Sequence, residues 1–214
     1  SHIRIRLRNG AVFTCEKALV LNPWNVDGRI ACEKEYKKKG HTSVQLRHHE
    51  AILELKEKIE NGPADKIYDI DLTYITSRGN WYYTSWKGNE EKSGGIASNI
   101  GVHFFDMLQW IFGPMENSSA DIKTKDTNSG KLTFKQANVN WYLSINAENL
   151  PQKAKDNGLS TFRTLSIEGE EIEFSKGFTD LHTVSYQHIL DEKGYGLADA
   201  KSSIEIVSKI RNQK

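Results

Sequence analysis

In the first part of the chain, two short apolar runs enclose a segment of helical character. Residues 11–15 and 42–46 are the apolar runs, and each predicts a short strand. Between them, Asn22 and Pro23 are typical of an N-cap and first helical position, so we expect a helix from there to Lys39. The order strand, helix, strand predicts a βαβ unit, which is the building block of a parallel sheet.

The residues before this unit have the character of a helix end. Residues 3–8 resemble the last turns of a helix, and Asn9 with Gly10 would close them as a C-cap. A domain rarely starts with the last turns of a helix. We therefore expect the chain to be a fragment whose first elements are missing.

Beyond residue 62 the hydrophobic period changes from helical to alternating. Residues 68–74, 132–134 and 138–145 alternate apolar and polar side chains, and a turn signal at 168–170 predicts a hairpin between 165–167 and 172–174. Helices are predicted over 48–60 and 197–211. One apolar and one polar sheet face is typical of an antiparallel sheet covered on one side. The fold class is thus α+β, with an open, mainly antiparallel sheet, helices on one face and a parallel βαβ part in front.

The most informative stretch is a buried helix that follows the glycine pair Gly94-Gly95 and ends at Gly113. Its apolar residues cover so much of the circumference that we expect it to be buried. Yet Asn99, His103 and Asp106 fall at i, i+4 and i+7, along one seam. Unpaired polar groups on a buried helix cost about 1–3 kcal/mol each, so these side chains need protein partners or a ligand.

Composition and charge narrow the classes of function. The chain has 214 residues, 37% of them hydrophobic, and a net charge of +1. Nothing in this balance indicates binding to nucleic acid or to a membrane, and no run is apolar enough to span one. Its 2 cysteines form neither a disulfide framework nor a zinc motif, so we expect a cytoplasmic protein without a metal site.

Several residues are candidates for binding or catalysis on their own chemistry. Lys17 and Arg47 each come just after a predicted strand, where parallel sheets bind ligands, and their charge suits an anion. His103 has a side chain that can exchange a proton with a hydroxyl near neutral pH. The segment 78–88, RGNWYYTSWKG, is aromatic and basic. It is either a ligand-binding loop or a packed surface loop.

These residues together resemble the Gfo/Idh/MocA oxidoreductase family. The resemblance rests on Glu16-Lys17 after a strand, on Gly94-Gly95, and on the spacing of Asn99, His103 and Asp106. It implies an N-terminal Rossmann domain that binds NAD(P), and a C-terminal α+β domain whose open sheet mediates oligomerisation. We accordingly assign 1–46 to the remnant of the NAD-binding domain and 47–214 to the substrate-binding and oligomerisation domain.

A closer resemblance covers most of the chain, including CEKALVLNPW, QLRHH, the 78–88 loop and SNIGVHFFDMLQWIFG. It is to the branch of this family that oxidises UDP-N-acetyl-glucosaminuronate at C3 with NAD, in surface polysaccharide precursor synthesis. That resemblance implies catalytic roles for Lys17, His103 and Asn99, with either Lys17 or His103 as the base. It implies contacts to the cofactor from Glu16, Lys17 and Arg47, and to the substrate from Lys87, Arg78, Tyr83, Arg163, Asn99 and His103. A homo-oligomer, dimer or tetramer, is expected.

The sequence departs from the family pattern in two ways. Ala18 stands where the family has proline after Glu-Lys, and no Gly-x-Gly-x-x-Gly is present. We therefore expect this chain alone to bind NAD poorly and to be inactive. Two alternatives stay open: a dehydrogenase of another sugar or polyol, or a non-catalytic oligomerisation module. The latter predicts that protein groups satisfy Asn99 and His103, with no cavity beside them.

Overall fold

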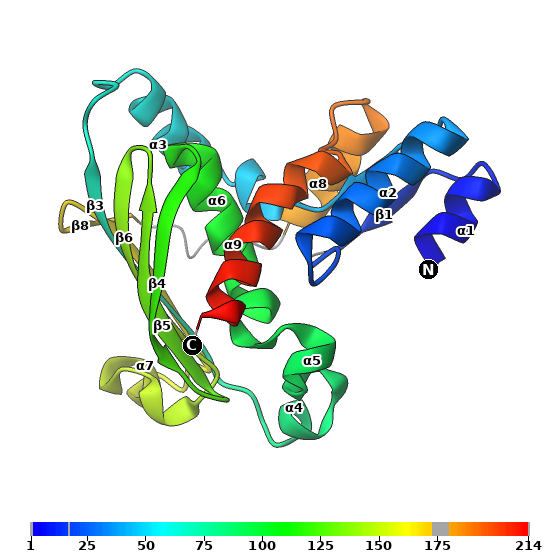
Figure 1. Ribbon diagram of the computed structural model, residues 1–214. Coiled ribbons are helices and arrows are strands. Elements are labelled where there is room, and N and C mark those ends of the chain that lie inside the picture. The colour runs from blue at the N-terminus through cyan, green and yellow to red at the C-terminus, as the bar shows by residue number, and fades with distance from the viewer. Residues whose placement is uncertain (1, 17, 173–179, 214) are drawn as a thin grey trace.

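The structure, a computed structural model, describes residues 2–16, 18–172 and 180–213. Within these residues the main sheet contains six strands in the order β4-β5-β6-β3-β7-β8 (Figure 1). The strands are β3 (Tyr68–Thr76), β4 (Met115–Lys123), β5 (Thr127–Phe134), β6 (Ala137–Ser144), β7 (Thr161–Ile167) and β8 (Glu170–Glu171). Only the β3–β6 pair is parallel among these described strands, so the predicted, mainly antiparallel sheet is confirmed.

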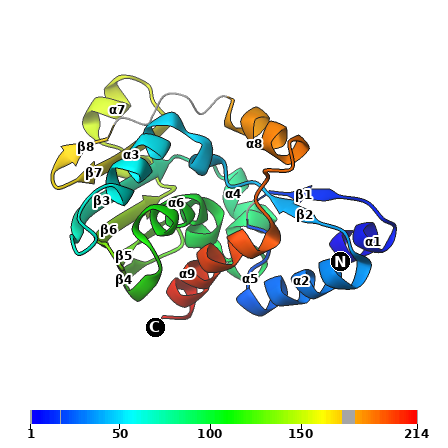
Figure 2. The same cartoon turned by 90° about the horizontal axis from the view of Figure 1, so that it is seen from above.

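Helices cover one face of this sheet, as the alternation predicted (Figure 2). The longer helices are α2 (Pro23–Tyr36), α3 (Glu50–Glu60), α6 (Val102–Phe112), α8 (Leu181–Leu190) and α9 (Lys201–Asn212). Of these, α3, α6 and α9 pack on the main sheet, whereas α2 packs on the β1–β2 pair and α8 on η1. Shorter helical turns are α1 (His2–Arg8), η1 (Gln45–His48), α4 (Trp81–Thr84), η2 (Trp86–Gly88), α5 (Glu90–Ser93), η3 (Ala97–Gly101), η4 (Ala147–Asn149), α7 (Gln152–Asp156) and η5 (Leu197–Ala200).

The main core lies between the sheet and α6. Trp141 of β6 and Phe105 of α6 are both fully buried, and their rings meet edge to face with centroids 5.4 Å apart. This geometry suits the quadrupoles of two aromatic rings. The opposite face of the sheet is polar, and there the Asn140 amide donates to Asp71 Oδ1 over 2.9 Å. The sheet is therefore open on one side.

A second hydrophobic cluster holds the N-terminal part of the chain. Strands β1 (Phe13–Cys15) and β2 (Gly40–Thr42) pair in parallel around α2, which confirms the predicted βαβ unit. Leu7, Phe13 and Val26 pack there against Leu197 and Ile204, which come from the C-terminal end of the chain. The last helix thus completes the core of the first strands.

Several predicted elements end elsewhere than expected. The second strand stops at Thr42, because the chain turns at Val44 into η1 instead of continuing to residue 46. The helix predicted to Lys39 ends at Tyr36, where Lys37 adopts a left-handed conformation, and the helix predicted from residue 48 begins at Glu50. Strand β4 was not predicted, since its residues are polar and mostly exposed. Of the predicted strand 172–174, residues 173 and 174 lie outside the described part.

Close packing in the β4–β5 ladder predicts opposite effects for alanine at two glycines. A Cβ at Gly130 would collide with the Ser119 carbonyl oxygen on β4, whereas one at the exposed Gly28 would meet nothing within 4 Å. We expect Gly130→Ala to lower the free energy of unfolding by about 1–3 kcal/mol. Gly28→Ala should raise the free energy of unfolding by about 0.5–1 kcal/mol, because alanine loses less conformational entropy than glycine when helix α2 forms. Urea unfolding of both variants checks this, and equal effects would contradict the described strand pairing.

The packing of α8 on η1 predicts a pH-dependent contribution to stability. The rings of His48 and His188 meet with centroids 4.5 Å apart, and burial, then the nearby His188 and Arg47, lower the pKa of His48 from 6.5 to about 4. The unfolded chain therefore binds a proton at His48 at higher pH than the folded chain does. The stability present above pH 6.5 should decline as pH falls towards about 4. Unfolding measured across this range should slope less in His48→Gln; an unchanged slope would contradict the lowered pKa.

Candidate functional site

The site is built where the glycine pair leads into the buried helix. Gly94 and Gly95 both have left-handed backbone (φ +78° and +72°), and a Cβ at Gly94 would collide with the Ser98 hydroxyl. The chain then forms the π-helical turn η3 before it continues as α6. Such turns are frequent at functional sites. Here the turn carries Asn99, and the first turn of α6 carries His103.

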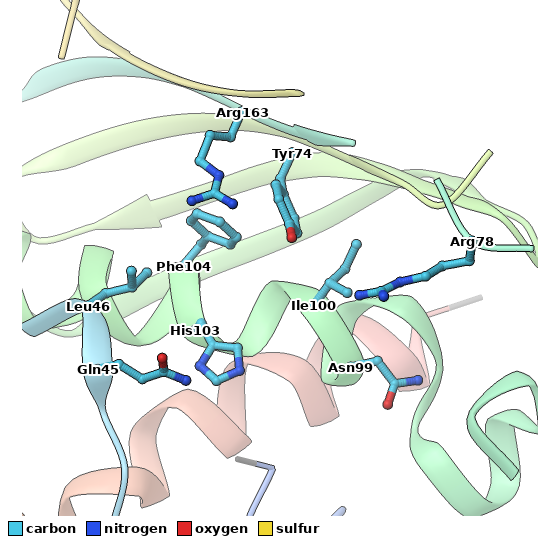
Figure 3. Close-up of a pocket in the computed structure, with 9 residues that line it drawn as sticks. All are labelled: Gln45, Leu46, Tyr74, Arg78, Asn99, Ile100, His103, Phe104 and Arg163. Carbon is cyan, nitrogen blue, oxygen red and sulfur yellow. The ribbon is translucent and has the colours of Figure 1, made fainter. Parts of the chain in front are cut away.

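Asn99 and His103 line a cavity of about 220 Å³ (Figure 3). One wall comes from η1 and another from the first turns of η3 and α6, while β3, β7 and the segment after β3 close the cavity from the sheet side. The lining residues are Gln45, Leu46, Tyr74, Arg78, Asn99, Ile100, His103, Phe104 and Arg163. None of these nine is acidic, and two are arginines. The cavity therefore favours an anionic ligand.

Asn99 is held in one orientation by the 78–93 segment. Its Nδ2 lies 2.9 Å from the Tyr82 hydroxyl oxygen, 3.1 Å from Ser93 Oγ and 3.2 Å from the Lys87 carbonyl oxygen. Because the nitrogen is committed to protein acceptors, the amide oxygen is the atom of Asn99 that can serve a ligand. Tyr82 is buried, and its burial raises the pKa of its hydroxyl, which therefore stays protonated.

The sheet side of the cavity is cationic and aromatic. The Arg163 guanidinium carbon lies 5.5 Å from the centre of the Tyr74 ring, and that ring packs on Phe104 with centroids 4.9 Å apart. Arg163 is partly buried, and Arg78 is exposed at the rim. The structure thus brings together four predicted site residues, namely Asn99, His103, Arg78 and Arg163.

Sequence reasoning missed Gln45 and Tyr74. Gln45 has the weaker signal, its place shortly after the end of β2. Tyr74 belongs to the inward-facing positions of β3 and so resembles an ordinary core residue in the alternating pattern. The sign that could have identified Tyr74 was its place near the carboxyl end of β3, where Arg78, just after the strand, also lines the cavity.

Arg47 and Asp106 form a buried ion pair beside this cavity and do not line it. Arg47 Nε and Nη2 lie 2.9 Å from the two carboxylate oxygens of Asp106, with side chains only 6% and 2% exposed. Arg47 was predicted to contact the cofactor; the structure places its guanidinium against Asp106.

The aromatic loop residues Lys87 and Tyr83 do not line the His103 cavity. Lys87 lines a second cavity of about 510 Å³, together with Tyr82, Glu90 and the β4–β5 hairpin residues Lys123 and Lys125. Tyr83 is exposed. The two cavities are neighbours, because Asn99 of the first is hydrogen bonded to Tyr82 and to the Lys87 carbonyl of the second.

The remaining predicted residues, Glu16 and Lys17, follow β1 in the sequence. Lys17 is outside the described residues. Glu16 is exposed, and its Oε1 lies 3.4 Å from Nδ1 of His182 on α8. Close by, at the end of β2, the hydroxyls of Thr42 and Ser43 are buried and have no hydrogen-bond partner among the described residues. These two hydroxyls are therefore unsatisfied within the described part of the chain.

Among the described residues, no cluster of three or more histidine, cysteine, aspartate or glutamate side chains could hold a metal ion. In the same part of the chain, none of the helices is both long and apolar enough to cross a bilayer.

Comparison with known proteins places this geometry in a family. The family model described as oxidoreductase family, C-terminal alpha/beta domain, matches residues 56–150. Among individual proteins, the putative oxidoreductase YteT of Bacillus subtilis is 26% identical over 91 residues, which cover 41% of this chain and only 21% of that protein.

Solved structures extend the likeness to the whole chain. The WlbA (WbpB) dehydrogenase of Thermus thermophilus, solved with NAD and alpha-ketoglutarate, is 40% identical to this chain, with a TM-score of 0.95. The match covers 100% of this chain and 68% of the Thermus chain. A second structure of it, with NAD and UDP-GlcNAcA, gives 39% identity, a TM-score of 0.94 and the same coverage. The Bordetella pertussis WlbA dehydrogenase, at 18% identity and TM-score 0.77 over 98% of this chain and 71% of that one, shares the fold. The chain belongs to the Gfo/Idh/MocA family of oxidoreductases.

Proposed function

We propose that this chain is the substrate-binding part of an NAD-dependent dehydrogenase that oxidises the C3 hydroxyl of a UDP-sugar uronate. The observation that carries the proposal is the cavity beside Asn99 and His103, with Arg78 and Arg163 on its other walls. A histidine can exchange a proton with a hydroxyl, an amide can form a hydrogen bond with it, and arginines can bind a carboxylate. A purely assembling module would not need such a cavity.

The ligands of the Thermus thermophilus relative support this reading. That dehydrogenase was solved with NAD and UDP-GlcNAcA, and separately with NAD and alpha-ketoglutarate. Both ligands other than NAD carry a carboxylate. By extension, Arg163 and Arg78 hold the carboxylate of the substrate in the present chain. Lys87 and Tyr83 contact the nucleotide part from the neighbouring loop.

The residues at the ends of β1 and β2 fit the cofactor. The buried hydroxyls of Thr42 and Ser43, which have no hydrogen-bond partner in the described part of the chain, lie where parallel sheets bind nucleotides. These hydroxyls would hold its nicotinamide end, together with Glu16 and Lys17. NAD, when bound, supplies the hydride acceptor. We assign residues 1–46 to the cofactor domain and 47–214 to the substrate domain of a longer protein.

The roles of the residues follow from their chemistry. His103 or Lys17 takes the proton of the C3 hydroxyl. The position of His103 on the first turn of α6, in the wall of the cavity, supports this role. The oxygen of Asn99 accepts a hydrogen bond from the substrate, because its nitrogen is fixed by Tyr82 and Ser93. The open polar face of the sheet mediates a homo-oligomer. Synthesis of a surface polysaccharide precursor is the pathway that we propose.

Calorimetric titration tests the substrate assignment. We expect the chain to bind UDP-GlcNAcA more tightly than UDP-GlcNAc, which lacks the carboxylate. Arg163→Gln should weaken UDP-GlcNAcA binding about tenfold or more, because a partly buried partner of the carboxylate is lost. Its effect on UDP-GlcNAc should be small.

The matched control is Arg8→Gln, which removes an exposed arginine on α1. It should leave both affinities unchanged. Equal affinity for the two sugar nucleotides would favour a dehydrogenase of another sugar. If neither sugar nucleotide binds, to this chain or to a full-length protein with NAD, the proposed substrate class is rejected.

A further inference from the structure

We infer that Arg47 is a positioning residue that sets the spacing between two walls of the His103 cavity, an inference that rests on the proposed function for its substrate. Gln45 and Leu46, the residues directly before Arg47, form one wall. His103 and Phe104, shortly before Asp106, form the facing one. The ion pair between Arg47 and Asp106 therefore joins the two walls next to where the cavity lies.

The geometry of this pair is that of a strong, specific contact. Two parallel N–H···O bonds of 2.9 Å connect the guanidinium and the carboxylate, and both side chains are almost fully buried. Bidentate pairs of this kind fix orientation as well as distance. If either partner were removed, the other would be left as a buried charge without compensation, which is strongly destabilising. The separation of η1 and α6 is consequently restricted at one point.

Further contacts hold the guanidinium from other directions. Its Nη2 also donates to the Asp199 carbonyl oxygen over 3.3 Å. The Tyr195 ring centre lies 4.7 Å from the guanidinium carbon, and that of Trp110 lies 5.7 Å away. A flat guanidinium can meet ring faces while its edge binds a carboxylate, whereas a lysine ammonium cannot do both. The position therefore requires arginine and not merely a positive charge.

This role differs from direct contact with the cofactor, which the family resemblance implied. A ligand contact would leave Arg47 with free donors facing a cavity. Instead, Nε and Nη2 donate to Asp106 and to the Asp199 carbonyl oxygen, Nη1 lies 3.8 Å from Asp199 Oδ1, and Arg47 lines neither the His103 cavity nor the Lys87 cavity. We therefore expect its effect on ligand binding to pass through the position of His103.

The experiment compares Arg47→Lys, Asp106→Asn and the control Lys56→Gln. Lys56 also contacts α6, with its Nζ 4.7 Å from the Trp110 ring centre and 3.1 Å from the Trp110 carbonyl oxygen, but it lies on α3, away from the cavity walls. Amide hydrogen exchange of each variant, measured without ligand, reports local loosening. Calorimetry with UDP-GlcNAcA reports the consequence for binding.

We expect both site variants to exchange faster in residues 44–49 and 102–107, with no change in β5 and β6, and to bind UDP-GlcNAcA about tenfold more weakly. Lys56→Gln should do neither. Unchanged exchange at 44–49 and 102–107 would overturn the inference, and unchanged exchange with weaker binding would indicate direct ligand contact. Faster exchange throughout the sheet would overturn it in favour of a general stability role. If the unaltered chain binds no uronate, the proposed function fails, while the exchange pattern still decides whether Arg47 fixes the two walls.

Discussion

The ion pair between Arg47 and Asp106 is the interaction on which the site depends. Burying two charges is expensive, and only near-ideal hydrogen bonding makes it tolerable. Here the fork of the guanidinium matches the carboxylate, and the Asp199 carbonyl takes a further bond. Because Arg47 follows the parallel strand pair while Asp106 belongs to the helix on the main sheet, the same contact fixes one structural part against the other. The cavity lies at this junction.

The last helix provides the apolar counterpart of this polar contact. On α9, Ile204 belongs to the cluster around β1 and α2, whereas Ile206 and Val207 belong to the cluster around α6. One helix therefore closes both cores. Its Arg211 also donates to the Leu21 carbonyl and to the Asn22 side chain, so that Asn22 does not cap its own helix. Residues at opposite ends of the sequence thus stabilise one arrangement of the cavity walls.

Sequence periodicity predicted the elements that bury one face and expose the other. It failed for elements that are exposed on both faces. β3 and β6 alternate regularly, and α6 has a broad apolar surface, so all three were found. β4 was missed because an exposed edge strand has little reason to alternate. The early end of β2 depends on long-range contacts of residues 42–49 with Tyr195 and Asp106, which no local pattern contains. For the same reason the sequence could group Asn99 with His103, but it could not pair Arg47 with Asp106.

The pairing also shapes the electrostatic character of the cavity. Asp106 lies one turn after His103, and an unpaired carboxylate there would oppose an anionic ligand through a low-dielectric interior. Arg47 neutralises that charge, with its Nε 2.9 Å from Asp106 Oδ2, so the pair carries no net charge towards the cavity. The field that a ligand meets is then set by the lining cations, Arg78 and Arg163. One buried contact thus restricts the shape of the cavity and preserves its preference for anions, which explains why a costly ion pair can be placed so close to a binding site.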